Sequence, residues 1–141
     1  MKKKIHKLTV DISSRIYVAG ISSHENDYRL SWAINNSLGF NLSKSDNLSL
    51  KNSKTGEIQQ FSVFVFTDED ESCRYHLVSN RCDDGFLIPE YKNVDFFLLA
   101  TGEIASYEFD LFIANLKQIE IITLAFAVSD LGTKSLEKLH F

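Results

Sequence analysis

The chain of 141 residues is poor in the residues that mark several common protein classes, with two cysteines, one proline and six glycines. Two cysteines are too few for the disulfide framework of a small secreted scaffold. The glycines form no phosphate-cradling loop, no dinucleotide-binding turn and no Gly-x-Ser-x-Gly elbow. No apolar run approaches the length of a membrane span. These absences count against four classes: disulfide scaffolds, nucleotide-loop enzymes, serine hydrolases of that type and helical membrane proteins.

Basic residues are fewer than acidic ones, with 15 Lys and Arg against 19 Asp and Glu, so the formal net charge is −4. A mildly acidic surface repels phosphate backbones, so we expect no nucleic-acid partner. The basic run Lys2–Lys4 resembles the start of a signal peptide, but the segment after it is broken by charge. We interpret it as a solubilising tail. The expected location is the cytoplasm, with reduced thiols and no membrane partner.

Aromatic residues are abundant, with 11 Phe and 5 Tyr. Wide, flat side chains favour the half-buried surface of a sheet. Neither a repeat nor a Pro/Gly/Ser linker divides the chain, so residues 1–141 are expected to form a single domain. The predicted strands lie at 5–12 (an edge strand), 16–21 (a central strand covered on both faces), 48–50, 60–66, 73–78, 94–100 and 121–128.

Two amphipathic helices are predicted. The first is capped by Ser22 with Glu25 three residues on, carries an apolar stripe from Leu30 to Leu38, and ends at Gly39. The second is capped by Ser106 and buries Phe109, Phe112, Ile113 and Leu116. A short helical turn is expected around 136–138. The predicted fold is therefore α+β, with a mixed, mainly antiparallel sheet of about six or seven strands and two main helices packed on it.

Metal and catalytic signatures are weak. Cys73 and Cys82 are nine positions apart and the four histidines are scattered, unlike the short spacing of zinc ligands. Whether the two cysteines form a disulfide depends on the fold. Cys73 and His76 would point to opposite faces of a strand, which argues against a catalytic dyad. The acidic run Asp68–Glu71 has the pattern of a solvated turn rather than a calcium loop. We predict no metal and no cofactor.

His24 lies at the junction between the central strand and the first helix. Free N–H groups at a helix start favour anions, and a histidine there could add positive charge. Glu25 and Asp27 already place negative charge in the same turn. Helix capping is therefore preferred over an anion site, although His24 is kept as a candidate.

Asp95 interrupts an otherwise apolar strand, on the face that Phe97 should occupy. A buried carboxylate must be paired, hydrogen-bonded or neutral. One interpretation is a catalytic or ligand-binding acid. The preferred one is structural, in which Asp95 fastens the preceding loop through hydrogen bonds or an ion pair with Arg29, Arg74 or Arg81. Neither interpretation applies if Asp95 lies at the exposed start of the strand.

The segment Ile88-Pro89-Glu90-Tyr91-Lys92-Asn93-Val94-Asp95-Phe96 resembles the signature of the IPExxxVDY family, small proteins of the Bacteroidetes with no assigned activity. Similarity also extends over residues 23–30 and 137–141. The resemblance implicates Ile88, Pro89, Glu90, Val94 and Asp95. Phe96 departs from the signature tyrosine, which argues against catalysis by a phenol there. Pro89 rigidifies the loop, as a folding device or as a presented binding edge.

We therefore predict a non-enzymatic binding or protein-interaction module, monomeric or a weak homodimer, with an unidentified protein partner. Its candidate binding residues are Ile88, Pro89, Glu90, Asp95 and His24, in the 88–93 loop, the 23–28 rim and the strand that follows the loop. The alternative is a small-ligand-binding protein or an enzyme that uses Asp95, Glu90 and His24 as acid-base groups. Self-association through an edge strand is compatible with the pattern but not required by it.

Overall fold

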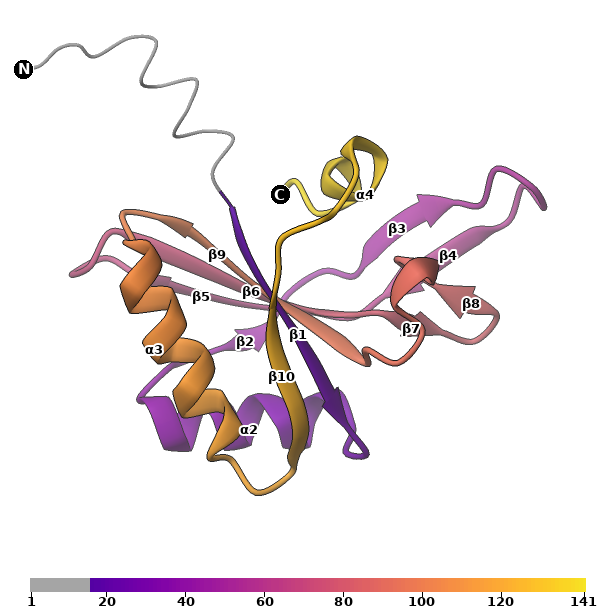
Figure 1. The fold of residues 1–141 in the computed structure, drawn as a ribbon. Coiled ribbons are helices and arrows are strands. Elements are labelled where there is room, and N and C mark those ends of the chain that lie inside the picture. The colour runs from indigo at the N-terminus through magenta and orange to yellow at the C-terminus, as the bar shows by residue number, and fades with distance from the viewer. Residues whose placement is uncertain (1–15) are drawn as a thin grey trace, which may run out of the picture.

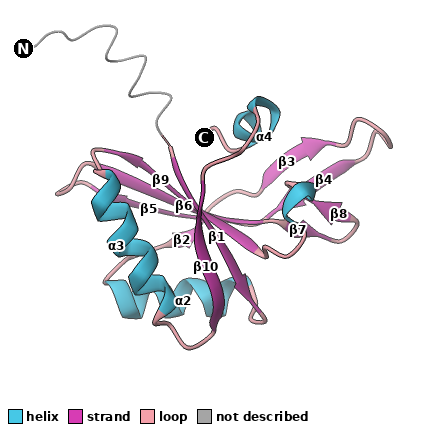
Figure 2. Cartoon of the chain, in the orientation of Figure 1, coloured by secondary structure: helices cyan, strands magenta, loops and turns pink. Residues whose placement is uncertain are grey.

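The computed structural model describes residues 16–141, so the expected strand over 5–12 lies outside the described part. One antiparallel sheet has the strand order β10-β1-β9-β6-β5-β2 (Figures 1 and 2). Its strands are β1 (Tyr17–Ser23), β2 (Ser43–Lys44), β5 (Val63–Asp68), β6 (Cys73–Ser79), β9 (Phe96–Gly102) and β10 (Ile122–Val128). The helices are α2 (Asp27–Leu38), α3 (Ser106–Lys117) and α4 (Thr133–Lys138). The α+β prediction is confirmed.

Two small hairpins and a turn complete the fold. β3 (Leu48–Lys51) pairs with β4 (Ile58–Phe61), and β7 (Arg81–Cys82) pairs with β8 (Gly85–Phe86). A 3-10 turn, η1, covers Pro89–Tyr91. These pieces lie on the side of the sheet opposite α2 and α3 (Figure 1).

The sheet buries side chains on both faces. On the helix face, α2 and α3 pack Leu30, Ile34, Phe109 and Phe112 against alternate residues of the strands. On the loop face, the cover comes from irregular segments and α4; its buried side chains are Phe61, Leu87, Ile88, Val94 and Leu139. Side chains alternate along a strand, so a strand covered twice is apolar throughout. This explains the continuous apolar runs of β1 and β9.

The predicted strand-helix-strand unit is β9-α3-β10. Both strands run antiparallel to β1 and therefore parallel to each other, but β1 lies between them. α3 crosses back over the helix face and lies against β10. Among residues 16–141, the last strand of the unit is an edge of the sheet.

Two predicted helix caps are wrong by a few residues. Asn26, not Ser22, caps α2, because its side-chain oxygen accepts from the N–H of Arg29 at 2.9 Å while Ser22 is held in β1. Ala105, not Ser106, precedes α3, and its N–H donates to Glu108 at 2.8 Å. The predicted end of α2 is confirmed, since Gly39 is left-handed with φ 70°.

The prediction of one strand over 60–66 is also wrong. The chain breaks at Ser62, so that β4 pairs with β3 while β5 enters the main sheet. The carbonyl of Ser62 accepts from the N–H of Ser79 at 3.0 Å, and this hydrogen bond holds the chain in place between the two strands. The apolar pattern runs through it because both segments contribute to the loop face, with Phe61 and Val63 buried there.

Candidate functional site

The loop from Asn80 to Asp95 is organised around one buried amide. Asn80 is 0% exposed, and its side-chain nitrogen donates to the carbonyls of Tyr91 (2.9 Å) and Val94 (2.8 Å). Its side-chain oxygen accepts from the N–H of Ile88 at 2.8 Å. A buried polar group that is fully bonded fixes the backbone around it. The signature segment thus has its conformation set from inside the protein.

Asp95 holds this loop to the end of β1. One carboxylate oxygen accepts from the N–H of Ser23 at 2.9 Å and the other from Nε of Arg81 at 2.6 Å. Arg81 also donates to the carbonyl of Lys92 at 3.0 Å. Of the three partners predicted for Asp95, Arg81 forms the ion pair. These bonds agree with the structural interpretation of this acid.

The candidate residues of the loop are divided between core and surface. Ile88 is 0% exposed, so its prediction as part of an exposed binding edge is wrong. The physical reason is that Pro89 starts η1 at the surface and leaves Ile88 directed into the loop-face core. Pro89 and Glu90 are exposed, and Phe96 is buried.

His24 is exposed beside the turn between β1 and α2. The neighbouring N–H of Ser23 is already bonded to Asp95, and the Ser23 hydroxyl donates to the carbonyl of Ile121 at 2.7 Å. The anion that this junction binds is therefore the protein's own carboxylate. Glu25 pairs with Arg29 at 3.6 Å across one helical turn.

The remaining titratable candidates are dispersed. Cys73 lies in the helix-face core and His76 on the opposite face, as their spacing predicted, and the thiols of Cys73 and Cys82 are both free. Burial, helped by the charge of Arg74, lowers the pKa of His76 to about 4. Its ring stacks on Phe141 with centroids 4.5 Å apart. His76 is thus a packed, neutral side chain under the C-terminus.

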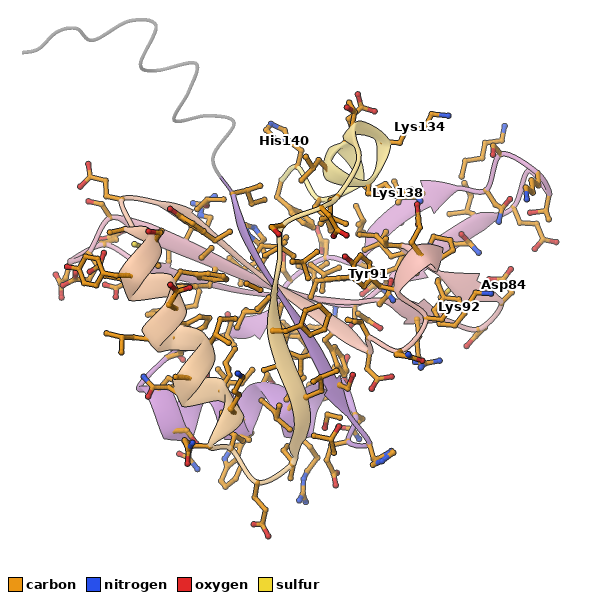
Figure 3. All side chains as sticks on the ribbon, in the orientation of Figure 1. Asp84, Tyr91, Lys92, Lys134, Lys138 and His140 are labelled. Carbon is orange, nitrogen blue, oxygen red and sulfur yellow. The ribbon has the colours of Figure 1, made fainter. Side chains whose placement is uncertain are left out.

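The C-terminal segment is fastened across the loop face. The ammonium of Lys138 donates to the carbonyl of Leu87 at 2.8 Å, and the hydroxyl of Tyr91 bonds to Asp130. Lys138 and Tyr91 are labelled in Figure 3. That hydrogen bond raises the pKa of Tyr91. Tyr91 also packs on Phe126 of β10, with ring centroids 6.1 Å apart. The loop therefore packs against β10 on the loop face of the sheet.

A polar cavity of about 760 Å³ lies between the start of α2, β4 and the β7–β8 hairpin. Its walls are already bonded to one another: Gln59 donates to Asp84 at 3.2 Å, and Asn47 to Gln60 at 3.1 Å. Hydrogen bonds from Cys82 and Gln59 lower the pKa of Asp84. His24, Glu90 and Asp95 do not line this cavity.

The two edges of the sheet differ sharply. β2 has two residues and includes Lys44, whose ammonium donates to the carbonyl of Ser45 at 2.6 Å and lies 6.0 Å from the ring centre of Phe64. Short strands and lysines are devices that keep other chains from pairing with an edge.

β10 has none of these protections. It is seven residues long, contains no charged residue and no proline, and has no strand on its outer side within residues 16–141. Thr123, Leu124 and Ala127 are exposed, and Leu124 is 47% exposed (Figure 1 shows β10 crossing in front of β1). The apolar strand was predicted from the sequence, but its place at the edge was not, because strand order depends on long-range pairing.

No protein-family model, curated protein or solved structure matches the chain. The resemblance to the IPExxxVDY signature therefore stays a prediction. None of the helices within 16–141 is long and apolar enough to cross a membrane. The same residues contain no group of three His, Cys, Asp or Glu side chains that could hold a metal ion.

Proposed function

We propose that this chain is a non-enzymatic protein-interaction module that binds its partner by adding a strand to β10. The observation that carries the proposal is the contrast between the two ends of the sheet. The outer strand β10 is long and uncharged, whereas β2 at the opposite edge is short and carries a lysine. An exposed apolar edge is a template for main-chain hydrogen bonds with another chain. Proteins normally blunt such an edge unless it is used.

The enzymatic alternative has less support. Both carboxylate oxygens of Asp95 are engaged, by Ser23 and Arg81. Glu90 is exposed on η1 and His24 on the turn after β1. An acid-base pair must share a concave site in which a substrate can bind. The polar cavity beside β4 and the β7–β8 hairpin is lined by none of the three residues.

The signature segment has a supporting part in this proposal. Ile88 and Val94 anchor the loop in the core, and Tyr91 braces Phe126 on β10. The proposal keeps the cytoplasmic location, where the free thiols of Cys73 and Cys82 would stay reduced.

Site-specific photo-crosslinking tests the proposal. p-Benzoylphenylalanine replaces Leu124 in the full chain, and a matched variant carries it in place of Ser43 on the β2 edge. Irradiation in the host cell should give an adduct of defined mass from position 124 and none from position 43. Equal adduct yields from the two edges, or none from either, would contradict the proposal. The adduct mass also tells a second copy of the chain from a different protein.

A further inference from the structure

We propose that the strand added to β10 is β10 of a second copy of this chain, in an antiparallel pair whose two-fold axis passes through Ala125. This inference rests on the proposed function and names its partner. Ala125 is the fourth of the seven residues of β10, so the axis leaves three residues on either side. The pairing would continue the antiparallel pattern of the whole sheet.

The side chains of β10 complement themselves in this register. With Ala125 opposite Ala125, Leu124 lies opposite Phe126 of the second copy, twice. Both residues point to the loop face, since Leu124 and Phe126 pair with Ser22 and Gly20 on the same side of β1. Directly opposed aliphatic and aromatic side chains are a favourable cross-strand pair. The exposed Leu124 would thereby be covered on the ring of Phe126.

The helix face offers small residues at the same place. Ala125 and Ala127 alternate with Leu124 and Phe126, so they point toward the helices; the register with β1 shifts at Thr123, which has no direct partner on β1. Ala127 of each copy would lie opposite the bulged segment around Thr123 of the other. No bulky side chain separates the two strands on this face, which lets α3 of each copy approach the axis.

α3 presents one side to the open edge. Ser106 and Asp110 line an apolar cavity of about 390 Å³ together with Ala127 and Val128. Asn115 and Gln118 line a cavity with α2 on the other side of the helix. Lys117 is seven residues, or about two turns, beyond Asp110 and therefore lies on the β10 side. Asp110 and Lys117 are both exposed, and neither is in an ion pair with another described residue.

The centre of this helix side coincides with the centre of β10. α3 runs antiparallel to β10, and Ser106 lies near Val128. The midpoint between Asp110 and Lys117 is about 11 Å along the helix from Ser106, at ~1.5 Å per residue. Ala125 is about 10 Å along the strand from Val128, at ~3.3 Å per residue. The axis through Ala125 therefore also passes near Ala114, midway between the two charges.

Charge complementarity follows from this coincidence. The axis makes the two α3 helices antiparallel, with the small side chain of Ala114 between them. Asp110 of one copy faces Lys117 of the other, and the pair occurs twice. A seven-residue strand pair alone falls short of the roughly 800 Å² per partner in a standard interface. The two helices supply the additional contact that a specific dimer needs.

Charge exchange between two variants tests the inference on the full chain, by sedimentation velocity and native mass spectrometry. The wild type should be dimeric at concentrations on the order of 1 to 100 μM. Asp110→Lys alone, or Lys117→Asp alone, places like charges opposite each other twice and should weaken the dimer roughly 30-fold. The double variant Asp110→Lys/Lys117→Asp restores both pairs and should restore the dimer.

Mixing the two single variants is the decisive arm. One chain then carries two lysines and the other two aspartates at these positions, so heterodimers should form with about the wild-type affinity, while each variant alone dimerises roughly 30-fold more weakly. Asp70→Lys, with the same charge change on the exposed β5–β6 turn, should leave the wild-type dimer intact.

A monomeric wild type over this range would overturn the inference, as would a dimer that is indifferent to the charge exchange. In either case the crosslink at position 124 still decides the proposed function: an adduct with a different protein keeps it, and no adduct removes it.

Discussion

The two edges of the same sheet are built in opposite ways. The β2 edge consists of only two exposed residues, and one of them is a lysine. At the β10 edge, seven uncharged residues run along a side that no strand of the described segment covers. Between them lie four strands that are covered on both faces, so the two edges belong to one continuous sheet and differ only in their own residues.

The contrast separates stability from function. A short edge with a lysine is what solubility alone requires. A long apolar edge adds a risk of aggregation, and we infer that it is retained because another chain covers it. The elements behind β10 support this view, because Tyr91 braces Phe126 and Gly20 leaves room for that ring.

The largest expected effect comes from removing the support of the loop face. Asn80→Ala leaves the N–H of Ile88 and the carbonyl of Val94 without partners and removes one of the two donors to the carbonyl of Tyr91, so it should lower the free energy of unfolding by about 3 kcal/mol. Urea denaturation measures the loss. Asn93→Ala, at an exposed position of the same loop, is the matched control and should cost less than about 0.5 kcal/mol. Similar losses for both variants would contradict the role given to Asn80.

Acid should loosen the C-terminal segment that follows β10, because His76 lies beneath it. The folded state holds the pKa of His76 near 4, below the 6.5 of an unperturbed histidine. The unfolded chain therefore binds a proton that the folded chain does not as the pH falls from about 6.5 to about 4, and stability drops by about 2 to 3 kcal/mol across that window.

His76→Phe keeps a ring against Phe141 and removes this titration. The difference between the unfolding free energies of wild type and variant should thus change with pH between about 6.5 and 4. A constant difference would show that His76 is not buried as described.

A lysine on each edge compares the two directly. Leu124→Lys places a charge on the open strand and should weaken self-association by about 30-fold, while Ser43→Lys adds the same charge to β2 and should change it less than about twofold. Equilibrium sedimentation gives both constants. Because Leu124 and Ser43 are exposed, both variants should melt close to the wild type. An equal effect at both edges would remove the distinction between them.

Asp95→Ala tests the contact between the loop and the end of β1, the strand that pairs with β10. It removes the partner of Arg81 and the acceptor of the Ser23 N–H, and should cost about 1 to 2 kcal/mol. Asp95→Asn keeps an acceptor oxygen for Ser23 and should cost less. Unchanged thermal unfolding of the alanine variant would exclude the structural role.

The smallest effect is expected at Gly20. A Cβ there would lie 2.9 Å from Cε1 and Cζ of Phe126, so Gly20→Ala should displace the ring that Leu124 of a second copy needs. Because the end of a side chain can move, stability should fall by about 1 kcal/mol or less, while self-association weakens several-fold. Gly132→Ala, with nothing within 4 Å of the new methyl group, is the control.

Local sequence patterns predicted the helices and strands well, but not which elements lie next to one another in the fold. The buried stripe Phe109, Phe112, Ile113 and Leu116 of α3 follows from helical spacing, and the end of α2 follows from Gly39. The break at Ser62 could not be predicted, because apolar residues continue through it. Asn80 was missed because sequence alone does not tell a buried amide from an exposed one.

The candidate site shows the same limit. Asp95 was singled out because a charge in an apolar strand is a local anomaly, and Arg81 was among its three predicted partners. The open edge of β10 is not local, because it exists only once β1 has inserted between β9 and β10. Strand order is decided by the whole chain.

Amide hydrogen exchange of β10, measured by NMR at several concentrations of the full chain, tests the central claim most directly. If a second copy covers the edge, the outward amides of Ile122–Val128 should exchange more slowly as the concentration rises, and those of Ser43 and Lys44 on β2 should not change. Exchange in β10 that is independent of concentration would contradict self-pairing at this edge.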